Sequence, residues 1–164
     1  MNLLDTNVLS EFMRPQPSEA VTAWLDRLPA KQVWTSAISR AEILLGLALM
    51  PAGKRQVALA RAAQAMFEED LAGNCLPFDE RAALHYAAIV ARRTHSGRPI
   101  STEDAQIAAI AIANNLTLAT RNVSDFEGID GLRIANPWLD VSLQETGRAG
   151  APRHPARVRV RAPG

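Results

Sequence analysis

The sequence contains a single cysteine, no lysine beyond residue 54 and no apolar segment of membrane-spanning length. One cysteine, Cys75, excludes an internal disulfide and a zinc site built from several thiolates. The most apolar segment, IAAIAIA at 107–113, is far shorter than the roughly 20 residues that a helix needs to cross a bilayer. No basic segment followed by an apolar stretch marks the N-terminus as a secretion signal. We therefore expect a cytoplasmic protein that does not bind membranes.

Several kinds of phosphate chemistry are also excluded by what is missing. There is no Gly-Lys-Ser or Gly-Lys-Thr sequence, so the chain has no nucleotide-binding P-loop. Phosphoacceptor signalling domains need a lysine after a late strand, whereas the only lysines are Lys31 and Lys54. A phosphatase of the haloacid-dehalogenase type needs a second aspartate two residues after the first, and the residue two positions after Asp5 is Asn7.

The composition fits one globular domain followed by a basic tail. Of 164 residues, 48% are hydrophobic and 21% are charged, so one domain can bury a core. After residue 147 there are five arginines and no acid, which leaves 13 basic and 17 acidic residues before that point and a net charge of −4. We predict a domain over residues 1–140 and a disordered tail over 141–164, whose arginines are either solvated or contact nucleic acid or an acidic partner.

Short apolar segments alternate with longer helical patterns along residues 1–140. Strands are predicted at 2–4, 32–36, 74–78, 116–120 and 131–136. Helices are predicted at 18–28, 40–50, 54–71, 80–94 and 102–114. Because strands separated by helices pair in parallel, this order predicts an α/β fold: a three-layer α/β/α sandwich with a central parallel sheet.

Acidic residues follow two of the predicted strands. Asp5 ends the first strand, and Asp125 lies with Asn122 in the loop after the fourth. Ligands of open parallel sheets bind beyond the carboxyl ends of the strands, so we expect these side chains to share one edge. The alternative is that Asp5 and Asn7 only cap a following turn or helix.

Two further acids are predicted in the first turns of helices that enter from the same edge. Glu42 follows the second strand, and Asp104 precedes the fourth. Ser39 with Glu42 fits a capping box, and Ser101 with Asp104 resembles one, so capping alone explains each acid. Capping does not explain why both helices become strongly apolar directly after the acid, which predicts that both carboxylates are partly buried.

Four carboxylates gathered at one edge predict a divalent metal site. Their mutual repulsion raises pKa values unless a cation neutralises them. Oxygen-only ligands favour a hard ion, Mg²⁺, with Mn²⁺ as a substitute. Such an ion supports phosphoryl transfer by neutralising phosphate charge and activating a water. Four polar neighbours could orient the carboxylates or their waters: Thr6, Asn7, Thr120 and Asn122.

Longer segments extend these motifs: LLDTNVLSE, TSAISRAEILLGL, ISTEDAQIAAIAIANNLTLATRNVSDF and the closing Asn136-Pro137-Trp138. In this order, over roughly residues 1–140, they resemble a PIN-domain ribonuclease, specifically the VapC-type toxin of a toxin–antitoxin pair. The resemblance implies a PIN-like nuclease domain, a metal-dependent endoribonuclease activity, a homodimer and inhibition by a cognate protein antitoxin.

The resemblance also implies roles for individual residues. It assigns the catalytic acids to four positions: Asp5, Glu42, Asp104 and Asp125. Asp5 and Asp104 match the metal ligands of the family, and Asp125 matches a more variable position for which Asn122 could substitute. Thr6 matches a hydroxyl-bearing residue of the pocket. We expect a metal-activated water to hydrolyse RNA phosphodiester bonds and to leave 5′-phosphate and 3′-hydroxyl ends.

An acidic pocket must be flanked by cations if RNA is to approach it. Four arginines beside the motifs are candidates for phosphate contacts, although each could equally be a solvated side chain: Arg14, Arg40, Arg98 and Arg121. Apolar residues near the site are candidates for antitoxin contact: Val8, Leu9, Phe12, Leu44, Leu45 and Leu47.

Two other functions remain open. One is a catalytically silent PIN domain that binds RNA or a protein. The four acids argue against it, because a surface that only binds RNA has no need to concentrate negative charge. The other is a PIN nuclease that processes RNA without acting as a toxin; small size and a single domain favour the toxin.

Overall fold

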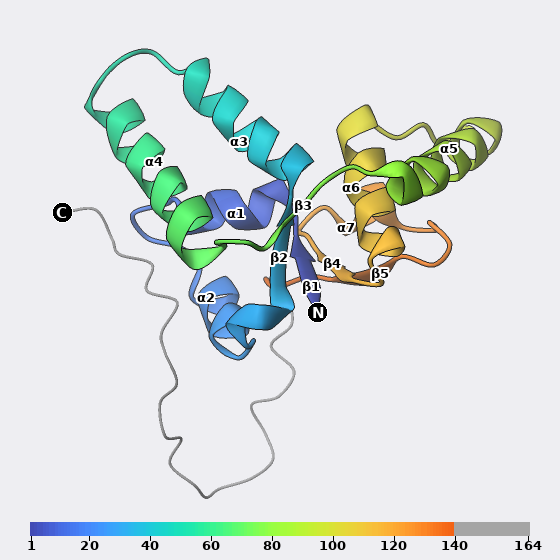
Figure 1. Ribbon diagram of the computed structural model, residues 1–164, viewed down its shortest axis with the longest axis horizontal. Helices are drawn as coiled ribbons and strands as arrows, with labels where there is room; N and C mark the ends of the chain where they lie inside the picture. The colour runs from blue at the N-terminus through green and yellow to red at the C-terminus, as the bar shows by residue number, and fades with distance from the viewer. Residues whose placement is uncertain (140–164) are drawn as a thin grey trace, which may run out of the picture.

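The computed structural model describes residues 1–139, so the predicted tail over 141–164 lies outside the described residues. Within them, five parallel strands form one sheet in the order β3-β2-β1-β4-β5 (Figure 1). The strands are β1 (Asn2–Leu4), β2 (Val33–Ser36), β3 (Cys75–Leu76), β4 (Thr117–Ala119) and β5 (Arg133–Ala135). The parallel sheet with helices on both faces confirms the predicted α/β/α fold.

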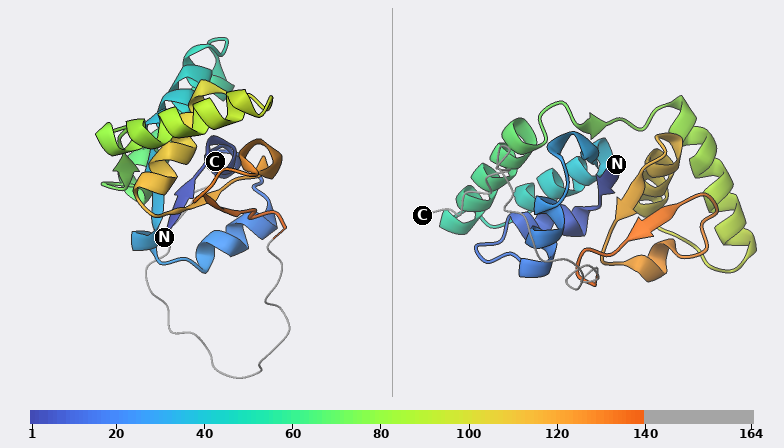
Figure 2. Two further views of the ribbon diagram at one scale, coloured as in Figure 1. Left: turned by 90° about the vertical axis from the view of Figure 1, so that its right-hand side faces the viewer. Right: turned by 90° about the horizontal axis from the view of Figure 1, so that it is seen from below.

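The helices divide into two groups, one for each face of the sheet. The first group shares a core and consists of α1 (Thr6–Phe12), α2 (Glu19–Asp26), α3 (Ala37–Ala48) and α4 (Lys54–Ala65). The second shares another core and consists of α5 (Glu80–His95), α6 (Thr102–Ala113) and α7 (Val123–Phe126). Figure 2 shows the two groups on opposite sides of the strands. No helix within residues 1–139 is long and apolar enough to cross a membrane.

The central strand β1 is buried on both faces. Leu3 is fully buried in the core beneath α5 and α6, and Leu4 is buried in the core beneath α1 to α4. This alternation follows from the period of two in a strand, and a strand covered on both faces is apolar throughout. The next residue, Asp5, is therefore the first one that the strand pattern does not require to be apolar.

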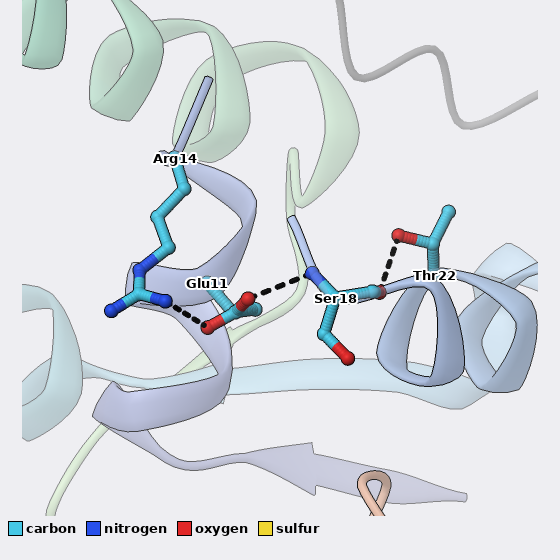
Figure 3. A network of polar contacts seen from close by, with 4 residues as sticks. All are labelled: Glu11, Arg14, Ser18 and Thr22. Atoms are coloured by element: carbon cyan, nitrogen blue, oxygen red, sulfur yellow. Dashed lines mark hydrogen bonds and ion pairs between the residues drawn. The ribbon is translucent and has the colours of Figure 1, made fainter. Parts of the chain in front are cut away.

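A buried glutamate holds the connection between α1 and α2. Glu11 is 5% exposed, and its Oε1 accepts a 2.7 Å hydrogen bond from the backbone N–H of Ser18 (Figure 3). Its Oε2 lies 3.4 Å from Nη1 of Arg14. Ser18 directly precedes α2, and its carbonyl accepts a 3.0 Å hydrogen bond from Oγ1 of Thr22. Glu11 thus joins the end of the first helix to the beginning of the second.

Several predicted boundaries were wrong. Helix α1 was not predicted, because a helix of seven residues is too short to show a clear helical periodicity of apolar residues. The helix predicted over 54–71 ends at Ala65 and continues as a π-helical turn, η2 (Met66–Asp70). A short 3₁₀ turn, η1 (Ala30–Gln32), precedes β2, and the strand predicted over 74–78 contains only β3.

Candidate active site at the carboxyl edge of the sheet

Asp5 lies at the junction between β1 and α1 and is 4% exposed. Its backbone N–H donates to the carbonyl of Ala119 on β4 at 3.0 Å, so the strand pairing extends to this residue. Its Oδ1 accepts from the backbone N–H of Thr6 at 2.8 Å, and Asp5 is the N-cap residue of α1. The capping interpretation therefore describes its geometry correctly, although capping does not account for its other neighbours.

The second oxygen of Asp5 is held by two side chains from distant segments. Oδ2 accepts from Nδ2 of Asn7 at 2.6 Å and from Oγ1 of Thr120 at 2.7 Å. Nδ2 of Asn7 also donates to Oγ1 of Thr120 at 3.0 Å, and Oδ1 of Asn7 accepts from the backbone N–H of Arg121. The network fixes the Asp5 carboxylate between the ends of β1 and β4.

Glu42 reaches the same edge from α3, but not from its first turn as predicted. The cap of α3 is Ser36, whose Oγ accepts from the backbone N–H of Ser39 at 2.9 Å, so the helix begins at Ala37. Glu42 consequently lies in the second turn, and the predicted capping box with Ser39 does not form. Its Oε2 accepts a 2.5 Å hydrogen bond from Oγ1 of Thr6.

Asp104 approaches from the other face of the sheet, in the first turn of α6. The N-cap of this helix is Ser101, whose Oγ accepts from the backbone N–H of Asp104 at 3.1 Å. Most of the helix after Asp104 is buried: Ala105, Ile107, Ala108, Ala109, Ile110, Ala111 and Ala113. The apolar continuation therefore brings the acid, itself half-buried, against the sheet edge.

Asp125 lies in α7, a helix of four residues, and not in an open loop as predicted. Asp125 is exposed, whereas the next residue, Phe126, is fully buried. Asn122 precedes this helix, and its side chain makes no capping hydrogen bond. The backbone N–H of Asn122 instead donates to Oγ1 of Thr120 at 3.0 Å, which connects α7 to the network around Asp5.

Electrostatic coupling shows that the acids are neighbours. Burial is the main cause that raises the pKa of Asp5, and the charge of Asp104 raises it further, while hydrogen bonds from Thr120, Thr6 and Asn7 act in the opposite direction. Burial also raises the pKa of Glu42; the Thr6 hydrogen bond lowers it, and the charges of Asp5 and Asp104 add to the rise.

The pKa of Asp104 is likewise raised, first by burial and then by the charges of Asp125 and Glu103, against a hydrogen bond from Ser101 that lowers it. Glu103 was not predicted as part of the site. It is an exposed residue in the first turn of α6, and its charge also raises the pKa of Glu42. Its position directly before Asp104 was the available signal in the sequence. Repulsion among these acids is the condition that a bound cation would relieve.

The donor set suits a hard divalent ion that keeps part of its water shell. Within residues 1–139, no three histidine, cysteine, aspartate or glutamate side chains lie close enough together to hold one ion between them. Mg²⁺ commonly binds proteins through one or two carboxylates and retains several waters. Asp5, whose pKa the charge of Asp104 raises, and Asp104 itself therefore fit such an ion by the chemistry of their oxygens.

The four candidate arginines lie in different surroundings. Arg14, which pairs with Glu11, has a side chain that is 63% exposed. Arg40 lies over the ring of Phe67 at 5.0 Å, and Arg121 over the ring of Trp138 at 5.4 Å.

Arg98 is exposed and lies beside Gly128, just beyond α7: a Cβ built on Gly128 would be 3.8 Å from its Nη1. The structure thus gives Arg98 a place next to the segment that bears Asp125. Arg40 and Arg121, in contrast, are engaged by aromatic rings.

A groove adjoins the acids on the side of α1, α3 and α4. Its volume is about 470 Å³, and both Thr6 and Glu42 line it. Apolar side chains form much of the wall, and two arginines accompany them: Met13, Ile43, Leu47, Met50, Leu59, Arg14 and Arg55.

Only some of the predicted apolar contacts are accessible in this region. Val8, Leu9 and Phe12 belong to the buried core. Leu47 also belongs to this core but lines the groove, and Leu44 and Leu45 are 49% and 59% exposed.

Comparison with known proteins places the chain in a family. The PIN domain family matches residues 3–132. The VapC ribonuclease Y4jK of Sinorhizobium fredii is 44% identical over 138 residues, which are 84% of this chain and 98% of that protein. Toxin FitB of Neisseria gonorrhoeae is also 44% identical, over 140 residues that cover 85% of this chain and all of that protein.

The fold is likewise similar to that of a solved complex. One chain in the structure of FitAB bound to a DNA fragment has a TM-score of 0.76 and 43% sequence identity, and the match covers 84% of this chain and 96% of that chain. The chain therefore belongs to the PIN-domain family and, within it, to the VapC-type toxins of toxin–antitoxin systems.

Proposed function

We propose that this chain is a metal-dependent endoribonuclease that acts in the cytoplasm as the toxin of a toxin–antitoxin pair. The observation that carries the proposal is the convergence of Asp5, Glu42 and Asp104 from three separate elements, with Asp125 beside Asp104. Burial and repulsion raise the pKa values of the first three acids. Keeping these carboxylates ionised costs folding free energy, which a protein without a functional need for them would avoid.

In this proposal, Asp5 and Asp104 provide oxygen ligands for Mg²⁺ or Mn²⁺. The ion would neutralise part of the phosphate charge and lower the pKa of an attacking water. Asn7 and Thr120 fix the Asp5 carboxylate so that it need not reorganise. Glu42 is held through Oε2, and its Oε1 has no hydrogen bond within the described residues, so Oε1 can accept a proton from the water. Asp125 lies near enough to Asp104 for its charge to raise the pKa of that carboxyl.

The deciding experiment is RNA cleavage by the purified chain with Mg²⁺ or Mn²⁺, beside the variants Asp5→Asn and Asp104→Asn. Asp130→Asn is a matched control, because within residues 1–139 this exposed acid pairs only with Arg92. We expect the wild type and the control to cut, both site variants to be folded but inactive, and the products to carry 5′-phosphate ends. Folded site variants that cut as well as the wild type would support a catalytically silent binding domain instead. Products with 2′,3′-cyclic phosphate would contradict attack by water.

A second proposal concerns the groove, which we assign to a segment of the cognate antitoxin. The support is the lining of the groove, which fits a peptide of mixed character. The apolar wall fits apolar side chains, the two arginines fit acidic ones, and Glu42 fits a basic one. Gly46 lines the groove, and a Cβ there would meet no atom within 4 Å. Gly46→Phe should weaken antitoxin binding by about tenfold or more. Ala48→Phe, on the same helix but outside the groove, is the control, and equal affinities of the two variants would refute the assignment.

We also propose a homodimer. Support comes from exposed leucines, since large exposed apolar side chains mark interaction surfaces: Leu45 on α3, Leu49 at the C-cap of α3, and Leu84 on α5. Light scattering after gel filtration gives the mass in solution, and a monomeric wild type at micromolar concentration would refute the proposal.

A further inference from the structure

Arg93 is the only arginine that is buried within the part of the chain described here. It lies in the last turn of α5 and is 7% exposed. It was not singled out from the sequence, although the spacing of Ala82, Tyr86, Ile89 and Arg93 places it on the inner face of the helix, where an apolar residue is expected. A charged residue at such a position needs a specific explanation, because burying a guanidinium costs free energy.

The guanidinium of Arg93 is directed to the backbone that carries Asp125. Its Nη2 donates to the carbonyl of Asp125 at 2.5 Å, and its Nη1 donates to the carbonyl of Glu127 at 2.9 Å. It forms no ion pair within residues 1–139, and its buried Nε has no hydrogen-bond partner there. Among the described residues, the charge is therefore stabilised by two carbonyl dipoles and by no counter-ion, which is an expensive way to stabilise a fold. What the planar guanidinium supplies is fixed geometry, since it spans two carbonyls at once.

Helix α7 depends on such support. A helix of four residues is not stable alone, and Asn122 provides no side-chain cap at its beginning. Phe126 anchors one side of it in the core, and Ile129 is the next residue that does so. A pocket of about 80 Å³ lies beside Arg93, Gly128 and Ile129. On either side of Phe126, the backbone carbonyls of Asp125 and Glu127 are held by the hydrogen bonds from Arg93.

We propose that Arg93 is a positioning residue of the nuclease site: it fixes the backbone of Asp125 and so holds that carboxylate beside Asp104. The inference rests on the nuclease function proposed above. Arg93 itself does not contact the acids; it acts through the peptide backbone from the inner side of α7.

Arg93→Lys keeps the charge but cannot reach both carbonyls, and Arg93→Met keeps the approximate length without a donor. Arg92→Gln is the matched control, because the neighbouring Arg92 makes, among the described residues, only an exposed pair with Asp130. The first readout is hydrogen–deuterium exchange of the metal-free proteins. We expect faster exchange in residues 121–128 of both Arg93 variants, and no change in these residues of the control, whose lost partner, Asp130, lies beyond them. Exchange that is unchanged in this segment, or faster throughout the chain, would overturn the proposal.

The second readout is single-turnover RNA cleavage by the Arg93 variants and by double variants that also carry Asp125→Asn. Loss of Arg93 should lower the cleavage rate about 10- to 100-fold with little change in RNA affinity, which is the usual effect of losing a residue that orients a metal-site ligand. Added to Asp125→Asn, the same change should alter the rate less than about twofold, because both act on one carboxylate. Equal losses with and without Asp125 would overturn the positioning role. If the wild type cuts no RNA, the nuclease proposal fails, whereas the exchange data still decide whether Arg93 holds α7.

Discussion

Thr6 and Glu42, which are 36 residues apart in the sequence, are joined by a 2.5 Å hydrogen bond from Oγ1 of Thr6 to Oε2 of Glu42. Thr6 is the first residue of α1, and Glu42 lies one turn into α3, so the bond links the two helices that leave neighbouring strands. Thr6 also donates its backbone N–H to Asp5. One residue therefore orients two of the acids.

Thr6→Val should lower the cleavage rate by about tenfold or more, because Glu42 loses the group that orients it. The hydrogen bond favours the ionised form of Glu42, so its removal raises the pKa of this carboxyl further. If ionised Glu42 accepts a proton, the acid limb of the pH–rate profile moves to higher pH. Thr6→Ser retains the hydroxyl and should keep both the rate and the profile. A Thr6→Val enzyme with the wild-type profile would show that Glu42 does not act as a base.

Metal-free stability should decrease as the pH rises above the ordinary range of carboxyl pKa values. Asp5, Glu42 and Asp104 have raised pKa values in the folded protein, so between the ordinary and the raised values the folded state binds more protons than the unfolded state. The free energy of unfolding then falls with increasing pH.

Asp104→Asn removes one of these charges and should raise Tm at neutral pH in the presence of a chelator. A gain of about 1 kcal/mol in the free energy of unfolding corresponds to roughly 2–4 °C in a chain of this size. Thermal unfolding followed between about pH 4.5 and pH 7.5 tests this. Parallel curves for the wild type and Asp104→Asn would show that the repulsion does not limit stability.

Mg²⁺ or Mn²⁺ should raise Tm of the wild type at neutral pH, because a ligand that binds only the folded state stabilises it. Asp5→Asn and Asp104→Asn should lose most of this increase, whereas Asp130→Asn should retain it. The comparison needs no RNA, so it tests the metal site independently of cleavage. A metal-dependent increase of the same size in all four proteins would place the ion elsewhere.

Glu11→Ala should destabilise the fold by about 1–3 kcal/mol, because the backbone N–H of Ser18 loses its buried acceptor. Glu11→Gln keeps a neutral acceptor and should cost less. Arg14→Ala removes a mostly exposed partner of Glu11 and should cost about 1 kcal/mol or less (Figure 3). Urea unfolding at constant pH measures all three. An Arg14→Ala protein as unstable as Glu11→Ala would mean that the ion pair, and not the hydrogen bond to Ser18, holds this connection.

The order of the five strands and of the five longer helices was predictable because it depends on local patterns, whereas the short helices α1 and α7 were missed. The apolar residues Leu3 and Leu4, directly before the polar Asp5, identify β1 from the local sequence, and the apolar segment after Asp104 identifies α6. The boundaries were less predictable, since they depend on which side chain caps a helix. Ser36 and Ser39 are both suitable caps, and only packing of the apolar face of α3 selects Ser36 and so moves Glu42 to the second turn.

The sequence by itself determined the fold class and the types of residue at the carboxyl edge, because strand and helix periodicity and the polar residues that end them are local features. Tertiary structure alone decided which of these residues touch. Thr120 contacts Asp5 across 115 positions, and Arg93 supports Asp125 from another helix. Such contacts form only when the sheet brings strand ends together and α5 packs on α6, and no short-range pattern in the chain encodes them.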